Sequence, residues 1–303
     1  MSNTITNNKI KKLLFIGSGA NNFGQEAEHD AAIYQVMPEL RGHGIDVFVI
    51  DENPYALSLE SLAAKTFWQP LTVHNIKKII RDEAIDTVVP LFGGDVSLRL
   101  WADVVQSWSH GDGNVPNTLG LNIDMLLKVN NLPALTDFMA KNGLPVINNY
   151  VLKAQDEANE LLRTLHLPLM VRALHPNQNN TRHIVERLDE FEDTINLAKS
   201  QSVTQEVIIS RAINGLKEIS LEILRDVRGN KMQIGASEDM DPIGIHTADS
   251  LSVSPILTVQ DQLISQMRDY AFRIADMLQL QGVMHVQFAI DDDDREIYII
   301  KVQ

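Results

Sequence analysis

The sequence predicts an α/β protein with two domains: a parallel-sheet domain followed by an α+β domain with antiparallel strands. In the first half, short apolar strand signals alternate with a helix signal, the order that gives a parallel sheet with helical crossovers. In the second half, one segment alternates apolar and polar residues, and two further strand signals flank a run of four aspartates. A chain of 303 residues is long enough to bury a core in each domain.

The parallel-sheet domain is expected over residues 1–120. Leu13–Ile16 predicts a short buried strand, Glu26–Leu40 carries apolar residues at helical spacing, and Asp46–Ile50 predicts a second strand. Thr87–Leu91 predicts a later strand of the same sheet. Since strand, helix and strand follow one another, we expect these strands to run parallel.

The second domain is expected over residues 121–303, because several turn-forming residues gather at residues 114–126. Within it, Lys217–Leu224 predicts a strand with one buried face and one polar face. A long helix is expected at Thr258–Leu280. The other expected elements are a helix at Asp124–Asn142, strands at Val283–Ile290 and Glu296–Gln303, and a polar turn at Asp291–Asp294.

The composition excludes several classes of function. The net charge of −14 and the pI of about 5.0 disfavour nucleic acid as a partner, because an acidic chain repels a phosphate backbone. The absence of cysteine excludes disulfides, thiolate metal ligands and a thiol nucleophile. Neither a signal peptide nor an apolar run of spanning length is evident. We therefore expect a soluble cytoplasmic protein without a membrane partner.

A glycine-rich loop follows the first expected strand, with Gly17, Gly19 and Gly24 ahead of the helix. Backbone N–H groups at such a helix start can hold an anion. The spacing is not that of a P-loop, because Gln25 stands where a lysine is needed. Asp51 also lies too far along the chain for the ribose-binding acid of a dinucleotide fold. A tight turn with close helix–strand packing is the favoured interpretation, and anion binding is the alternative.

Four blocks of sequence, in order, resemble the large subunit of carbamoyl phosphate synthetase, in the first of its two synthetase halves. They are GSGANNFGQ at 17–25, DPIGIHTADSLSVSP at 241–255, GVMHVQFAI at 282–290 and YIIKVQ at 298–303. The resemblance implies a pre-ATP-grasp domain over 1–120 and an ATP-grasp domain over 121–303. The sequence stops before the Pro-Arg that follows in the family, so we expect the second domain to be short at its C-terminal end.

The resemblance also implies an ATP site. Arg172 and His246 match residues of the family that lie at the nucleotide, and they are the expected catalytic residues on the phosphate side. Taken alone, a lone histidine is more often structural and Arg172 would be interpreted as part of a surface ion pair. Glu218 matches a glutamate that holds the ribose hydroxyls, and Ile213 matches a position whose backbone meets the adenine. The expected nucleotide-binding set is Arg172, Ile213, Glu218, Gly244, Ile245, His246 and Gln287.

The expected metal site departs from the family. The family binds Mg²⁺ or Mn²⁺ through Gln, Glu and Asn, and the matching positions here are Gln287, Lys301 and Gln303. Gln287 and Gln303 remain candidate ligands. A protonated lysine has no free lone pair and repels a cation, so Lys301 cannot replace the carboxylate. Two interpretations stay open: ATP chemistry is weakened or lost, or Lys301 contacts a phosphate directly and metal use is altered.

Other segments depart from the family as well. An arginine-rich run is replaced by NNLPAL at Asn130–Leu135, which carries no cation. The flap that is glycine-rich in the family corresponds to ALHPNQNN at Ala173–Asn180, which contains no glycine. Arg211 stands where the family has a glutamate that faces the adenine amino group.

The resemblance implies ATP-dependent phosphorylation of bicarbonate to carboxyphosphate, which then reacts with ammonia. The implied ligands are ATP, bicarbonate and ammonia, with Mg²⁺ or Mn²⁺ in doubt, and a glutaminase small subunit is a candidate partner. Arginine and pyrimidine biosynthesis are the expected setting. Another ATP-grasp ligase is the close alternative. The alternative of a different class is a degenerate paralogue, a nucleotide-binding regulatory or structural module without ligase activity, and Lys301 favours it.

Overall fold

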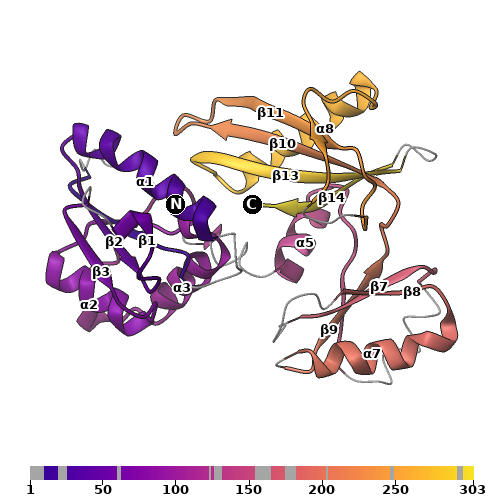
Figure 1. Cartoon of the computed structure of the whole chain (residues 1–303), viewed down its shortest axis with the longest axis horizontal. Coiled ribbons are helices and arrows are strands. Elements are labelled where there is room, and N and C mark those ends of the chain that lie inside the picture. Colours follow the sequence, from indigo (N-terminus) through magenta and orange to yellow (C-terminus); the bar gives the residue numbers. More distant parts are fainter. Residues whose placement is uncertain are drawn as a thin grey trace. The chain divides into compact units, whose positions relative to one another are not determined.

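The chain forms two compact units in the computed structural model (Figure 1). The first unit comprises residues 1–130 and 278–281, and the second comprises residues 131–277 and 282–303. The expected domain limits stay a prediction. The structure describes residues 10–19, 26–59, 63–122, 124–125, 132–153, 165–174, 182–202, 204–245, 249–291 and 296–303.

The first unit contains a parallel sheet of strand order β3-β2-β1-β4-β5, which confirms the predicted parallel α/β architecture. Helix α1 contributes to the apolar core on one face, and helices α2 and α3 contribute to the core on the other. The strands are β1 Lys12–Ile16, β2 Asp46–Asp51, β3 Lys65–Trp68, β4 Thr87–Val89 and β5 Asn117–Thr118, and the helices are α1 Glu26–Gly42, α2 Val73–Glu83 and α3 Gly94–Gln106.

The alternation of side chains along the central strands builds these two cores. Leu13 and Phe15 of β1 pack with Ile33 and Met37 of α1. Leu14 and Ile16 point to the opposite face, toward the apolar residues of α2 and α3. Both sets are almost fully buried, as expected for a parallel strand covered on both faces.

One predicted strand in this unit is too long. The strand expected at Thr87–Leu91 ends at Val89, because Pro90 has no N–H for the sheet ladder and Leu91 begins a short 3₁₀ turn. The 3₁₀ turns of the described chain are η1 Leu57–Leu59, η2 Leu91–Gly93, η3 His110–Asp112 and η4 Leu188–Glu190.

The second unit contains two sheets. The larger one, the main sheet below, has the order β12-β11-β10-β13-β14 and is antiparallel throughout. Helix α8 packs against β10 and β13, with buried residues such as Met267 and Ile274. The elements are α5 Leu132–Lys141, β10 Lys217–Arg225, β11 Lys231–Asp239, β12 Ser252–Val253, α8 Asp261–Met277, β13 Gly282–Asp291 and β14 Glu296–Val302.

The smaller sheet is also antiparallel, in the order β6-β9-β7-β8. Helix α7 covers one of its faces, where Phe191, Ile195 and Ala198 join the apolar side chains of the strands. This half of the chain is the α+β architecture that the sequence predicts. The elements are β6 Tyr150–Leu152, β7 Leu169–Ala173, β8 Arg182–Val185, α7 Phe191–Ser200 and β9 Val207–Arg211.

One predicted helix of this half is shorter than expected, and another lies partly outside the described residues. In place of Thr258–Leu280, α8 spans Asp261–Met277, since Thr258 hydrogen-bonds Glu238 and Gln279 has a left-handed φ of 51°. Within the range 124–142, residues 124–125 are helical and α5 begins at residue 132; residues 126–131 lie outside the described chain. No helix among the described residues is long and apolar enough to span a membrane.

Candidate nucleotide site

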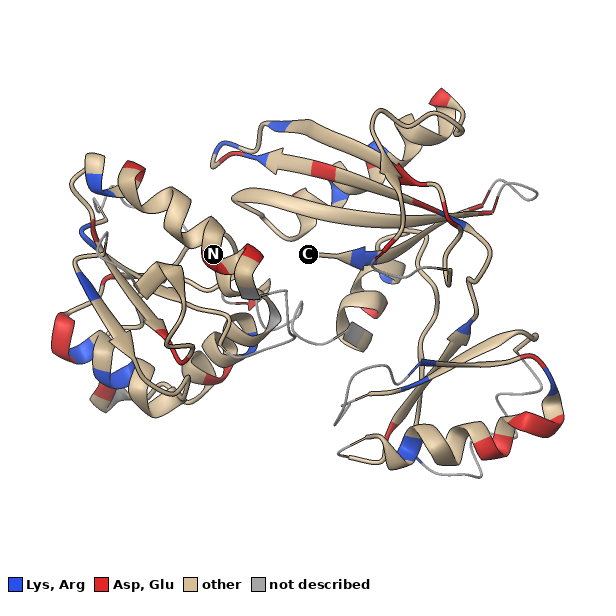
Figure 2. Ribbon diagram, viewed as in Figure 1, with Lys and Arg blue, Asp and Glu red and all other residues tan. Residues whose placement is uncertain are grey.

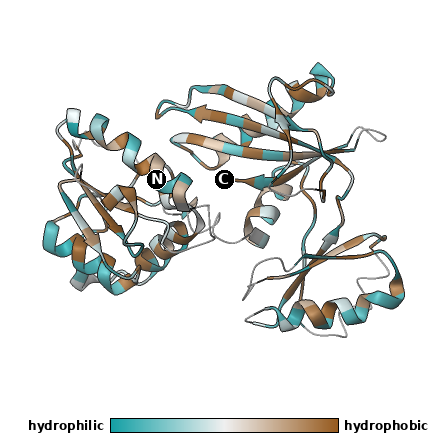
Figure 3. Ribbon diagram, viewed as in Figure 1, coloured by the Kyte–Doolittle hydropathy of each residue, from teal (hydrophilic) through white to brown (hydrophobic). Residues whose placement is uncertain are grey.

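The main sheet has one apolar face and one polar face. Along β10, Ile219, Leu221 and Ile223 are fully buried, whereas Glu218 and Glu222 between them are partly exposed. The same alternation of apolar and polar residues is visible along the neighbouring strands in Figure 3. The apolar face packs against α8, and the polar side chains lie on the opposite face.

Cross-strand pairing sorts the polar side chains into rows, because directly paired residues of antiparallel strands share a face. The first row contains Ser220, Gln287 and Lys301 on β10, β13 and β14. In the next row, Glu222 pairs with His285. The two rows place most of the residues expected at the metal close to one another.

A β-bulge puts Lys301 on this face. From Asp291 and Glu296 at the turn, the β13–β14 ladder is regular as far as Phe288 and Ile299. A regular continuation would pair Gln287 with residue 300 and turn Lys301 toward the apolar face. The register shift between Gln287 and Phe288 pairs Gln287 with Lys301 instead.

The second row is tied together by side-chain and backbone contacts. His285 Nδ1 lies 2.5 Å from Glu222 Oε1. His285 and Gln303 also exchange two backbone hydrogen bonds, each 2.9 Å long. Glu222 is therefore engaged by a histidine, and Gln303 is fixed beside that histidine at the end of the sheet.

The residues expected at the metal do not fit a magnesium centre. Mg²⁺ prefers hard oxygen ligands, usually with a carboxylate, in octahedral geometry. Gln287 and Gln303 can offer only neutral amide oxygens, and Lys301 offers a cation. Among the described residues, no group of three or more His, Cys, Asp or Glu side chains could hold a metal ion.

Glu218 lies in an unfavourable electrostatic environment. Partial burial, followed by the nearby charge of Asp239, raises the pKa of Glu218 above its usual value. Lys301, His285 and Arg182 act in the opposite direction and favour the carboxylate. Glu218 is thus held among charges from both sheets of the second unit.

The smaller sheet presents an arginine pair on the face opposite α7. In the β7–β8 ladder, Arg172 lies directly opposite Arg182, and Ile208 of β9 flanks Arg172 on its other side. Among the residues that the structure describes, no carboxylate forms a salt bridge with either arginine. The charged residues of both sheets are coloured in Figure 2.

Arg172 stays charged despite its surroundings. Burial, and then the neighbouring charge of Arg182, lower the pKa of Arg172 to about 10. That value still leaves the guanidinium protonated near neutral pH. An unpaired guanidinium beside a second one is a favourable place for an anion, because the planar fork matches phosphate oxygens.

The segment around Ile213 lies against the segment around Gly244. Gly215 N–H donates to Ile243 O over 2.9 Å, and Ile243 N–H donates to Leu216 O over the same distance. Gly244 has a φ of +98°, and a Cβ there would lie 2.2 Å from Asn214 Nδ2. Position 244 therefore favours glycine for two reasons: its φ angle is positive, and the Asn214 side chain leaves no room for a Cβ.

Arg211, at the end of β9, is held by residues of β13 and β14. Its guanidinium lies 3.3 Å from Asp291 Oδ2 and 3.5 Å from Glu296 Oε2, and it also hydrogen-bonds the hydroxyl of Tyr298. Burial, and then the hydrogen bond to Glu296, raise the pKa of Tyr298 to about 12. Arg211 therefore joins the two sheets of this unit.

Some predicted site segments cannot be placed. His246 lies outside the described residues, as do residues 20–25 of the glycine-rich loop and residues 175–180 of the flap. Residues 130–131 and 292–294 fall outside them as well. Of the predicted nucleotide-binding set, Arg172, Ile213, Glu218, Gly244, Ile245 and Gln287 all lie in the second unit. Their roles stay predictions.

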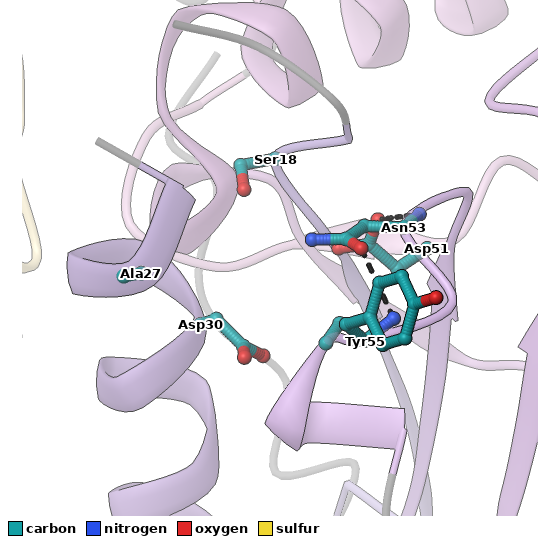
Figure 4. Close-up of a pocket in the computed structure, with 7 residues that line it drawn as sticks. Ser18, Ala27, Asp30, Asp51, Asn53 and Tyr55 are labelled. Carbon is teal, nitrogen blue, oxygen red and sulfur yellow. Dashed lines mark hydrogen bonds between the residues drawn. The ribbon is translucent and has the colours of Figure 1, made fainter. Parts of the chain in front are cut away.

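A separate small cavity of about 190 Å³ lies in the first unit (Figure 4). Asp30 and Asp51 line it, and their oxygens already accept backbone N–H groups: Asp51 from Asn53, and Asp30 from Leu57 and Ser58. A Cβ at Gly17 would lie 2.0 Å from Asp51 Oδ2. Close packing and two carboxylates favour the tight-turn interpretation of the glycine loop over anion binding.

Sequence reasoning missed Arg182 as a site residue. It lies beyond the flap segment, and only the register of β8 against β7 brings it opposite Arg172. The sequence offered no clear clue, because Arg182 is exposed at the start of β8 and His183 separates it from the apolar residues of that strand. The contacts of Arg211 were likewise missed, since they join residues far apart in the sequence.

Comparison with solved structures gives the class of the fold. Campylobacter jejuni biotin carboxylase in an ATP complex superposes with a TM-score of 0.74 at 16% identity, over 97% of this chain and 65% of that one. The biotin carboxylase domain of Hydrogenobacter thermophilus 2-oxoglutarate carboxylase, in complex with MgADP, ADP and bicarbonate, gives a TM-score of 0.71 at 16% identity, over 97% and 64%. The chain has the ATP-grasp fold preceded by a parallel α/β domain.

The family follows from sequence. Residues 134–303 match the model of the carbamoyl-phosphate synthase L chain ATP-binding domain, and residues 9–125 match the preATP-grasp domain of carbamoyl phosphate synthase. The chain belongs to the carbamoyl phosphate synthase large-chain family. The large chain of Agathobacter rectalis is 31% identical over 297 residues, which cover 98% of this chain and 28% of that protein. This chain therefore spans little more than a quarter of that relative's length.

Proposed function

We propose that the second unit binds ATP and that the phosphates lie at Arg172 and Arg182. The single observation that carries this proposal is the pairing of these two arginines across β7 and β8 without a carboxylate partner among the described residues. Like charges placed directly opposite each other destabilise a sheet. An anion between them would remove that cost, and a triphosphate is an anion that suits two guanidinium groups.

The other parts of the nucleotide have candidate contacts in the same unit. In this proposal the backbone near Ile213 meets the adenine, beside the closely packed Gly244 and Ile245. Glu218, on the polar face of the main sheet, holds the ribose hydroxyls. Gln287 lies on the same face, opposite Ser220, and His246 is the proposed further residue on the phosphate side.

The reaction that we propose is the phosphorylation of bicarbonate, as in the synthetase family. A bicarbonate oxygen attacks the γ-phosphorus of ATP, the bond to the β-phosphate oxygen breaks, and ADP leaves with carboxyphosphate formed. Ammonia then attacks the carboxyl carbon, phosphate departs and carbamate is produced. Arg172 would stabilise the charge of the transferred phosphoryl group, and no step is assigned to a metal ion. A glutaminase subunit is the proposed source of ammonia.

The test is ADP production by the whole chain with ATP, with and without bicarbonate. Bicarbonate-stimulated ADP release that is lost in Arg172→Met would support phosphoryl transfer. The matched control is Arg187→Met, since Arg187 is exposed, follows the end of β8 and forms its own salt bridge with Asp189. ADP release that ignores bicarbonate, or that is equal in both variants, would contradict the proposed reaction.

A second candidate function is a nucleotide-binding regulatory or structural module without ligase activity. Lys301 favours it, because a lysine then stands beside Gln287 at the position where metal-dependent phosphoryl transfer in the family uses a carboxylate. This candidate predicts saturable ATP binding with no ADP release. Recovery of ADP release in Lys301→Glu would indicate an enzyme that lost its activity through this one position.

A further inference from the structure

The row of Ser220, Gln287 and Lys301 shows what the main sheet offers to a bound phosphate. Two of the three side chains are neutral, and the third carries a positive charge. The β-bulge beside Gln287 turns that charge onto the polar face, where a regular hairpin would have turned it toward the core. The β-bulge therefore places the Lys301 ammonium on the polar face of the main sheet.

Two carboxylates, Glu218 and Glu222, lie on the same polar face as Lys301. Glu222 is engaged by His285 at 2.5 Å. Glu218 is influenced by the charges of Lys301 and Arg182, one from each sheet. The row itself offers a divalent cation the Lys301 ammonium and two neutral side chains.

We propose that this site binds ATP without a divalent cation, and that the Lys301 ammonium supplies the positive charge that a metal would otherwise supply. The inference rests on the ATP binding proposed above. Metal-free ATP is more negative than its magnesium complex, so it gains more from a protein cation. Lys301 on the main sheet and Arg172 and Arg182 on the smaller sheet are the cations in question.

The test is calorimetric titration of the whole chain with ATP, once in EDTA and once in excess magnesium. The unaltered chain is expected to bind at least as tightly in EDTA as in magnesium. Lys301→Met is expected to weaken binding in EDTA by roughly tenfold or more, the usual effect of losing a charge-assisted hydrogen bond. Lys301→Glu is expected to bind only when magnesium is present.

The matched control is Lys78→Glu, which makes the same charge change at an exposed site on α2 in the first unit and should leave both titrations unchanged. Circular dichroism and thermal unfolding would verify the fold of each variant. Should Lys301→Glu fail to fold, the two titrations of the unaltered chain still decide the matter. Magnesium-enhanced binding to that chain would overturn this inference and leave the ATP site standing. Absence of binding under both conditions would overturn the proposed function as well.

Discussion

Arg172 and Arg182 lie directly opposite each other on β7 and β8, on the same face of the sheet, and neither forms a salt bridge with a carboxylate among the described residues. Structural ion pairs place opposite charges together, and this ladder does the reverse. A like-charge pair costs stability, so its presence is more readily explained by an anionic ligand than by the fold.

The first prediction follows from that cost. Arg182→Thr should raise the free energy of unfolding by about 0.2–1 kcal/mol, because it removes the repulsion while threonine favours a strand. The same change should weaken ATP binding. Urea unfolding and ATP titration of one preparation would measure both effects. A variant that is destabilised and binds ATP normally would show that Arg182 is structural.

Gly244 provides a second prediction. Gly244→Ala should lower the free energy of unfolding by more than Gly215→Ala, since only the former brings a Cβ within 2.2 Å of the Asn214 side chain. Both glycines have positive φ angles, +98° and +87°, so Gly215→Ala reports the backbone cost alone, about 1–2 kcal/mol. Equal losses in the two variants would mean that the approach to Asn214 is unimportant.

A third prediction concerns Glu218 and pH. Burial and the charge of Asp239 raise the pKa of Glu218 in the folded state. Protonated Glu218 therefore stabilises the fold below about pH 4.3, and this contribution to the free energy of unfolding is lost as the pH rises through the folded-state pKa. Glu218→Gln should therefore stabilise the protein at neutral pH and remove this part of the pH dependence. It should weaken ATP binding if Glu218 holds the ribose. The test is to measure unfolding midpoints across pH 4–7. The idea is wrong if Glu218→Gln has the same pH dependence as the unaltered protein.

Glu238 should show the opposite sign. Burial alone would raise its pKa, but hydrogen bonds from Thr258 and Leu257 outweigh it, and the net pKa is lowered. Its stabilising contribution is present above about pH 4.3 and is lost as pH falls through the folded-state pKa. Because three donors converge on this carboxylate, Glu238→Gln should cost about 1–3 kcal/mol at neutral pH. Glu186→Gln, at an exposed position, is the control and should change the urea midpoint little.

Local patterns predicted much of the fold. The apolar runs of β1 and β2 and the alternation along Lys217–Leu224 are governed by burial within each strand, so the sequence contains enough information to find them. Helix ends were less predictable. The end of α8 depends on the left-handed backbone at Gln279, which periodicity does not reveal.

The geometry of the site depends more on pairing between strands, which is not local. A hairpin that is regular from its turn would pair Gln287 with residue 300. The observed pairing arises from the bulge. Arg182 was missed for the same reason, because its position opposite Arg172 is set by the register of two strands.

The most direct test of the ATP site is a comparison of ATP with adenosine as ligands of the whole chain, measured by calorimetry. If the arginine pair holds the phosphates, ATP should bind at least tenfold more tightly than adenosine, and Arg172→Met should remove most of that difference. If ATP binds no more tightly than adenosine, or neither binds at millimolar concentration, the arginine pair is not a phosphate site and the account is wrong.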